Sequence, residues 1–352
     1  VFLTLILVPF ISFSQVINKS LYYDGLNREY IIYIPANYDG SINVPLFFSF
    51  HGGSGYASDH MQMTNINAIS DTAGFIAVYP QGALDINGAE PGNTPSTSWL
   101  HKAPTTHNDV NFISSIIDTL SNEYTIDLDR IYACGYSEGG IFSYELACRL
   151  SNKIAAIGSV SGSMLTESFR TDYGFGNCSP VHPTAIILIP GTNDGSYHSL
   201  YSGFQPYYLS ANEITNYWTS VNNTDLNPIS SNVNNTNTND GSIVEKYEWK
   251  NGDNCVSITE LKVVGGGHDW PGSFGNMDIN ASGEIWKFVS RFNINGMINC
   301  NTNQLQENIF TKKKEIIKTF DQLGRFVKKE QENHLYFYIY NDGSVEKRIN
   351  LK

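Results

Sequence analysis

Residues 130–140 read RIYACGYSEGG, and this segment sets the expectations for the fold. An apolar run that ends in a serine between glycines is typical of a strand that turns sharply into a helix. Residues 135–139, GYSEG, match the pattern G-x-S-x-G, in which the serine occupies a strained turn whose close neighbours must lack a Cβ. A surface turn can also need glycines, so a nucleophilic role for Ser137 requires partners elsewhere in the chain.

The sequence on either side of this turn alternates between expected strands and expected helices. Apolar runs typical of strands are found at residues 28–35, 44–53, 74–82, 155–162, 184–194, 243–250 and 257–268. Helical patterns are found at residues 59–73, 108–124, 139–150 and 281–292. The alternation predicts an α/β fold with a mostly parallel sheet covered by helices. Residues 221–241, rich in Asn, Thr and Ser, are expected to run over the surface.

A second glycine-rich turn, HGGSG at residues 51–55, follows another expected central strand. Backbone N–H groups can approach a carbonyl oxygen closely where side chains are absent, which makes Gly53 a candidate donor to an oxyanion. The N–H of Glu138, directly after Ser137, is the other candidate because it points to the same space. His51 precedes Ser137 in the chain and is interpreted as a structural histidine of this turn.

Two more strand ends supply an acid and a base. Asp194 lies in the turn GTNDG, and His268 lies in GGGHDWPG after an apolar run. Asp is common in turns for local reasons, but the chain order Ser137, Asp194, His268 is that of α/β-hydrolases. Asp269 is a poorer candidate for the acid, because sequence neighbours in a loop seldom face each other. In this interpretation His268 removes the Ser137 proton, and Asp194 holds the tautomer of His268.

Four side chains are expected to line the substrate pocket: Tyr136, Trp99, Trp270 and His198. The aromatic rings can stack on a sugar or an aromatic acyl group, and packing beneath long loops is the alternative interpretation. His198 follows Asp194 closely in sequence, which places it near the same strand end. Substrate specificity is expected to lie in three loops, residues 56–65, 86–106 and 196–210.

The composition excludes some classes of function. Of 352 residues, 41% are hydrophobic and 16% charged, which is typical of a folded protein. The net charge is −12, although residues 311–352 carry 10 Lys/Arg against 6 Asp/Glu. The main body is therefore strongly acidic, which argues against nucleic acid as a partner. The Cys and His residues lack zinc-site spacing, and neither a metal nor another cofactor is expected.

The N-terminal residues 1–14, VFLTLILVPFISFS, resemble the apolar region and cleavage site of a secretory signal peptide that is truncated at its front. A buried first strand is the alternative interpretation. No later stretch is long and apolar enough for a membrane helix, so the mature protein is not expected to span a membrane.

The five cysteines are expected to fall into two groups. Cys134 and Cys148 lie in apolar settings typical of buried thiols, whereas Cys178, Cys255 and Cys300 lie in loop-like sequence and are better disulfide candidates. An odd count leaves at least one cysteine unpaired within the monomer.

Together these motifs resemble a known family. The blocks HGGSG, YPQG, RIYACGYSEGG, PGTNDGSYH and VVGGGHDWPG are similar to those of esterases grouped with polyhydroxybutyrate depolymerases, relatives of the feruloyl and acetylxylan esterases of carbohydrate esterase family one. The resemblance covers residues 16–295 and implies an α/β-hydrolase fold. It also implies Ser137 as nucleophile, Asp194 as acid, His268 as base, and Gly53 and Glu138 as oxyanion donors. Glu138 stands where the family usually has an uncharged residue, which is expected to disfavour anionic substrates.

The C-terminal tail resembles the sorting domain of the type IX secretion system of Bacteroidetes, through DQLGRFV and YFYIYNDGSVEKRI. Such a domain implies passage across the outer membrane, with attachment to the cell surface or release. NDGS between two β-rich runs predicts a hairpin, and a β-rich binding module is the alternative. The expected organisation is a signal peptide at 1–14, an esterase domain at 15–296, a linker at 297–308 and a sorting domain at 309–352.

The sequence thus predicts a secreted serine esterase that acts on feruloyl or acetyl esters of a polymeric or oligomeric polysaccharide, with the type IX secretion machinery as partner of the tail. A depolymerase of polyhydroxybutyrate-type polyesters is the alternative within the same chemistry. A surface glycan-binding protein that keeps the fold without activity is the alternative of a different class.

Overall fold

The computed structural model describes residues 13–85, 96–99, 108–172, 174–300, 316–322, 325–327, 334–340 and 345–349. The chain divides into two compact units, residues 1–300 and residues 301–352. The expected signal peptide except its last two residues, most of the expected specificity loop at 86–106 and most of the expected linker lie outside the described residues. So do the residues that join the two strands of the predicted hairpin.

The first unit is built on one sheet with the strand order β1-β2-β4-β3-β7-β8-β9-β12-β11-β10. The strands are β1 Gln15–Tyr23, β2 Leu26–Ile34, β3 Val44–Phe50, β4 Ile76–Pro80, β7 Ile126–Tyr136, β8 Ala156–Val160, β9 Ala185–Ile189, β10 Ile229–Asn232, β11 Ile243–Trp249 and β12 Ile258–Val264. Strands β4, β3, β7, β8, β9 and β12 run parallel, and antiparallel strands extend the sheet at both edges. This arrangement confirms the predicted α/β fold with a mostly parallel sheet.

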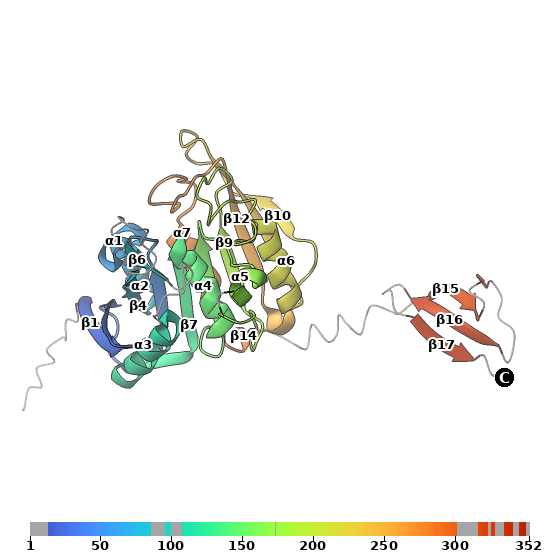
Figure 1. Cartoon of the computed structure of the whole chain (residues 1–352), viewed down its shortest axis with the longest axis horizontal. Helices are drawn as coiled ribbons and strands as arrows, with labels where there is room; N and C mark the ends of the chain where they lie inside the picture. The colour runs from blue at the N-terminus through green and yellow to red at the C-terminus, as the bar shows by residue number, and fades with distance from the viewer. Residues whose placement is uncertain are drawn as a thin grey trace, which may run out of the picture. The chain divides into compact units, whose positions relative to one another are not determined.

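Helices cover both faces of this sheet (Figure 1). The helices are α1 Ala57–Thr64, α2 Ile66–Ala73, α3 Asp109–Glu123, α4 Glu138–Arg149, α5 Glu167–Asp172, α6 Ala211–Asn222 and α7 Ala281–Val289, with a short 3₁₀ turn at Asp253–Cys255. Apolar side chains of α3, α4 and α6 join one core cluster, and those of α1, α2 and α7 join the other. Because side chains alternate along a strand, Phe48 packs in the first cluster and Phe47 in the second. Both faces of the central sheet are therefore packed against helices.

Several segments differ from the sequence-based expectations, among them the edge strand β1, which was not predicted from the sequence. The helix expected over 59–73 is interrupted at Asn65, which adopts a left-handed conformation (φ 49°) between α1 and α2. Consequently the expected specificity loop at 56–65 is mainly helix α1. Helix α6 was not predicted, although Ser210 and Glu213 form a capping box that marks its start. The Asn- and Thr-rich segment contains the edge strand β10, whose residues are exposed.

The cysteines also correct an expectation. Cys148 forms a disulfide with Cys178, and Cys255 forms a disulfide with Cys300. Cys134 is a buried free thiol, as its apolar surroundings suggest. The prediction of a thiol at Cys148 was wrong, because this residue lies in the last turn of α4, where the loop that contains Cys178 returns to the helix.

The second unit contains a three-stranded antiparallel sheet of β15 Ile316–Asp321, β16 Leu335–Tyr340 and β17 Val345–Ile349. Alternate residues of β16, namely Tyr336, Tyr338 and Tyr340, form its small core. This is the separate β-module expected at the C-terminus.

Four shorter strands lie in the first unit, where β5 Ala83–Asp85 pairs with β6 Ser96–Ser98 and β13 Phe292–Asn293 with β14 Gly296–Met297. In the part of the chain that the structure describes, no helix is long and apolar enough to cross a membrane.

Candidate active site

The turn between β7 and α4 holds Ser137 in a conformation that few non-glycine residues adopt, with φ 56° and ψ −119°. The backbone N–H of Ser137 donates to Val160 O on β8 over 2.8 Å, which fixes the turn to the sheet. The flanking glycines are required because of close backbone contacts. A Cβ on Gly135 would overlap the backbone of Gly139, and a Cβ on Gly139 would overlap the carbonyl of Phe50 on β3.

The loops that follow four parallel strands meet beside Ser137, because parallel strands end at the same edge of the sheet. His268, after β12, lies with its Nε2 2.9 Å from Ser137 Oγ. Its Nδ1 lies 2.7 Å from Oδ2 of Asp194, which follows β9. The structure therefore brings the three residues proposed from the sequence into one hydrogen-bonded chain. In such a chain the imidazole can take a proton from the hydroxyl. The carboxylate then stabilises the imidazolium cation that forms.

Asp194 is buried, yet several donors favour its ionised form. Oδ1 accepts the backbone N–H of Ser196 over 2.9 Å, and Oδ2 accepts the hydroxyl of Ser199 over 2.8 Å. Burial raises the pKa of Asp194, but hydrogen bonds from His268, Ser196 and Ser199 outweigh this effect and hold the pKa below its ordinary value. The carboxylate thus stays charged and accepts a hydrogen bond from the Nδ1–H of His268.

The predicted oxyanion donors, Gly53 and Glu138, lie close to Ser137. Glu138 is the first residue of α4, where backbone N–H groups point out of the helix end. A Cβ added to Gly52 would lie 3.2 Å from Ser137 Cβ, and one added to Gly53 would overlap the Glu138 carboxylate. The turn at 52–53 therefore packs directly against the start of α4.

The turn at 52–53 is held by His51, in the structural role expected from the sequence. The N–H of Gly82 donates to His51 Nε2 over 2.9 Å, so the ring proton is on Nδ1 and donates to Gly52 O over 2.6 Å. Burial lowers the pKa of His51 to about 4, which keeps the ring neutral. Gln81 adds a second support, because its amide donates to Gly55 O over 3.2 Å and accepts the N–H of Ala57 over 2.9 Å.

His198 contacts the side chain of Ser137 directly. Its Nε2 lies 3.0 Å from Ser137 Oγ, a hydrogen-bond distance equal within 0.1 Å to that of His268. Its own backbone oxygen accepts the N–H of Ser163, which follows β8, over 3.1 Å. A second backbone hydrogen bond, from Leu209 N to Met164 O over 2.9 Å, also fixes this loop to the segment that follows β8.

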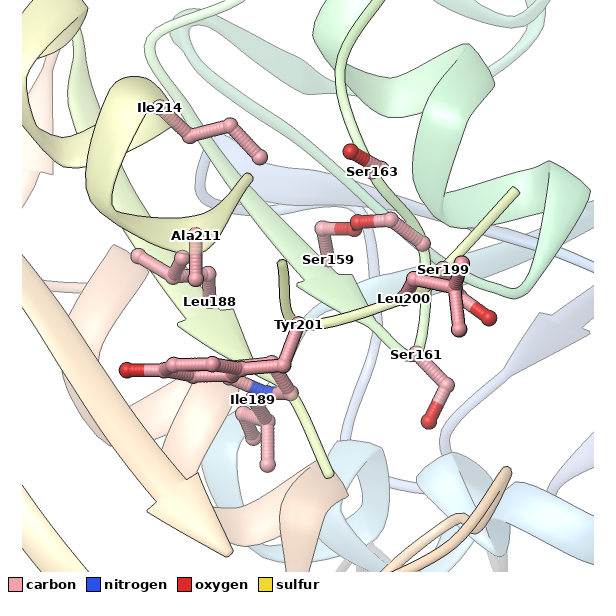
Figure 2. A pocket seen from close by; sticks show the side chains of 12 residues that line it. Ser159, Ser161, Ser163, Leu188, Ile189, Ser199, Leu200, Tyr201, Ala211 and Ile214 are labelled. Atoms are coloured by element: carbon pink, nitrogen blue, oxygen red, sulfur yellow. The ribbon is translucent and has the colours of Figure 1, made fainter. Parts of the chain in front are cut away.

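A small pocket is lined by Ser199, Leu200 and Tyr201 of this loop and by Ser161 and Ser163, which follow β8 (Figure 2). It is on the scale of a single water molecule, so an ester substrate does not fit there.

The predicted aromatic side chains have different positions. Tyr136 donates its hydroxyl to His268 O over 2.6 Å, and its ring lies 5.0 Å from the imidazole of His268. Trp99 is fully buried between Phe50 and Phe142 and donates its indole N–H to the His51 carbonyl.

Trp270 is also buried, with its indole N–H donated to Ser282 Oγ over 3.2 Å. The expectation that the indole rings of Trp99 and Trp270 stack on a substrate is therefore corrected, because neither ring has an exposed face. Packing beneath the loops, the alternative interpretation, describes both residues.

Sequence reasoning missed two residues of the site, Ser199 and Gln81. Ser199 Oγ lies 2.8 Å from Asp194 Oδ2 and 3.1 Å from His268 Nδ1, so it touches both partners of the proposed proton relay. A serine in a serine-rich loop carries no pattern that marks it. Asp269, the poorer candidate for the acid, instead accepts a hydrogen bond from the N–H of Gly267 over 2.9 Å. Within the described ranges, no group of His, Cys, Asp and Glu is arranged to hold a metal ion.

Comparison with known proteins relates this site to a family of esterases. Residues 28–174, which include β3, β4, β7 and the serine turn, match the family described as Esterase PHB depolymerase. Among curated proteins, the bifunctional acetylxylan esterase/xylanase of Neocallimastix patriciarum is 30% identical over 288 residues, covering 79% of this chain and 35% of that protein. Feruloyl esterase B of Piromyces equi is 25% identical over 278 residues, covering 76% of this chain and 46% of that protein.

The chain thus spans about a third to a half of the length of these relatives. Among solved structures, the acetyl xylan esterase from Aspergillus awamori aligns with a TM-score of 0.53 at 14% identity, covering 78% of this chain and 98% of that one. This likeness concerns the fold alone. Residues 28–174 therefore match the Esterase PHB depolymerase family model, and the first unit has an α/β-hydrolase fold.

Proposed function

We propose that this protein is a serine esterase that hydrolyses carboxylic esters through an acyl-enzyme intermediate. The observation that carries the proposal is the hydrogen-bonded chain from Ser137 Oγ to His268 Nε2 and from His268 Nδ1 to Asp194 Oδ2, at 2.9 and 2.7 Å. The esterase names of the relatives support the same reaction class.

In the first half-reaction, His268 accepts the Ser137 proton while Oγ attacks the acyl carbon. The N–H groups of Gly53 and Glu138 stabilise the resulting oxyanion. His268 then gives the proton to the departing alcohol, and the acyl group remains on Ser137. In the second half-reaction, His268 takes a proton from water, the hydroxyl attacks the acyl carbon, and the C–Oγ bond breaks to release the carboxylic acid.

The proposed substrates are feruloyl or acetyl esters of a polysaccharide. Aromatic rings that can stack on a sugar lie on the loop that carries His198, where Tyr197, Phe204 and Tyr207 remain 51%, 40% and 39% exposed. The rings of Phe204 and Tyr207 lie nearly parallel, with centroids 5.9 Å apart. Aliphatic polyesters are the second candidate, which the family match to residues 28–174 favours.

The proposed location is outside the cell, either free or on the outer surface. Two disulfides, Cys148–Cys178 and Cys255–Cys300, suit an oxidising compartment. The C-terminal β-module, residues 309–352 of the proposed organisation, would serve as the sorting domain recognised by the type IX secretion machinery, after a signal peptide at 1–14 and a linker at 297–308.

The reaction class is tested with p-nitrophenyl acetate and the full chain. We expect wild-type protein to release p-nitrophenol and Ser137→Ala to lose several orders of magnitude in rate. Equal rates for the two proteins would reject the esterase and favour a non-catalytic glycan-binding protein.

The substrate class is tested with a panel of methyl ferulate, acetylated xylan, short-chain polyhydroxybutyrate and a p-nitroanilide peptide. We expect turnover of the first two. Turnover of polyhydroxybutyrate alone would establish the polyester alternative, and turnover of the anilide alone would indicate a peptidase.

A further inference from the structure

The oxygen of Ser137 lies between two imidazole rings rather than one. His268 Nε2 is 2.9 Å from Oγ and His198 Nε2 is 3.0 Å from it, and the two rings are perpendicular with centroids 5.7 Å apart. We infer that His198 is a second catalytic histidine, which donates its Nε2–H to Oγ and assists the release of the acyl group from Ser137. This inference rests on the proposed esterase function.

The direction of the two hydrogen bonds follows from the protons available. Asp194 is ionised and accepts only, so the 2.7 Å contact requires the proton of His268 on Nδ1. His268 Nε2 is then an acceptor, and the single hydroxyl proton of Ser137 is donated to it. Because Oγ has no second proton to give, His198 Nε2 must be the donor in the 3.0 Å contact.

A donor at this position affects the two half-reactions unequally. In the free enzyme Oγ is a hydroxyl oxygen, which accepts a hydrogen bond well, so His198 stabilises both the starting state and the transition state of acylation. In the acyl-enzyme Oγ is an ester oxygen, a poorer acceptor. When the C–Oγ bond breaks, its electron pair returns to Oγ, and the His198 hydrogen bond strengthens with the developing charge.

The proton balance leaves His198 unchanged. His268, protonated by the attacking water, gives that proton to Oγ as the bond breaks, and Ser137 recovers its hydroxyl. His198 keeps its Nε2 proton throughout and acts only as a hydrogen-bond donor. The loop anchors hold it in place for this role, since Ser163 N–H donates to the His198 carbonyl and the ring of Tyr197 packs edge-on at 4.9 Å.

The test separates the two half-reactions by rapid mixing with p-nitrophenyl acetate. The initial burst of p-nitrophenol reports acylation, and the following steady state reports deacylation. We expect His198→Ala to slow deacylation by about tenfold to a hundredfold, somewhat less than the loss of an oxyanion donor, and to slow acylation much less. His198→Gln, whose amide can still donate, should recover most of the deacylation rate.

The matched control is His182→Gln, because the His182 ring bonds to the backbone oxygens of Ser151 and Pro183, away from the site. Both rates should equal those of the wild type. Unchanged deacylation in His198→Ala, or an equal loss in both half-reactions, would overturn the inference. Failure of the esterase proposal is a separate result, because wild-type protein would then give neither a burst nor a steady state above Ser137→Ala.

Discussion

The hydroxyl of Ser199 should stabilise the fold through the buried carboxylate of Asp194. Ser199 is itself buried and donates to Asp194 Oδ2 over 2.8 Å. A hydrogen bond to a charged group contributes about 1.5–3 kcal/mol, so Ser199→Ala should lower the free energy of unfolding by about that amount at pH 7. The loss of this donor also moves the pKa of Asp194 upward, because the hydroxyl is one of the groups that hold it below its ordinary value.

The stability deficit of Ser199→Ala should depend on pH in a defined direction. A carboxyl whose pKa is lowered in the fold stabilises the fold above its unfolded pKa, and this contribution is lost as the pH falls through the folded pKa. The deficit of Ser199→Ala should therefore be full at pH 7 and shrink in acid, where Asp194 becomes protonated in both proteins. Urea unfolding at a series of pH values measures the deficit directly.

The matched control is Ser196→Ala in the same loop. Ser196 supports Asp194 through its backbone N–H, which the substitution keeps, so its free energy of unfolding should match that of the wild type. Two results would refute the reasoning: equal stability of Ser199→Ala and the wild type at pH 7, or a deficit of constant size down to low pH.

Two other predictions concern the backbone and the disulfides. Gly139→Ala should unfold at much lower urea concentration than the wild type, because its Cβ would overlap backbone atoms of β3. Gly283→Ala in α7 meets only ordinary contacts, so its stability should equal or exceed that of the wild type. Equal urea midpoints for the two variants would contradict this. Cys148→Ser should lose about 3.5 kcal/mol of stability, because the 30-residue loop to Cys178 is no longer closed. Thermal melting with and without reductant checks this: Cys134→Ala should lose as much stability on reduction as the wild type, whereas Cys148→Ser should lose only the part due to Cys255–Cys300.

The sequence could reveal features that are local in the chain. Glycines must surround Ser137 because the turn itself is strained, and loops that follow parallel strands must meet, so Asp194 and His268 were identified by their positions. The elements of the sheet were recognisable for the same reason, since apolar runs bounded by glycine describe buried strands. The order of the strand ends along the chain therefore predicts most of the residues of the candidate site.

Contacts between distant segments could not be read in the same way. The pairing of Cys148 with Cys178 depends on where a loop returns, and the burial of Trp99 depends on Phe50 and Phe142, which lie far away in sequence. Ser199 has a role only because its loop folds back onto Asp194. Helix α6 is different, because its capping box was present in the sequence and went unrecognised.

The hydroxyl of Tyr136 ties the residue before the nucleophile to the backbone of His268. His268, the proposed base, is therefore tethered by this hydrogen bond to the turn that carries Ser137. An ancestral enzyme with this tether can exchange or lengthen its rim loops and still keep the reacting atoms aligned. New ester specificities can then arise in evolution by changes at the rim alone, without each change having to rebuild the reaction centre.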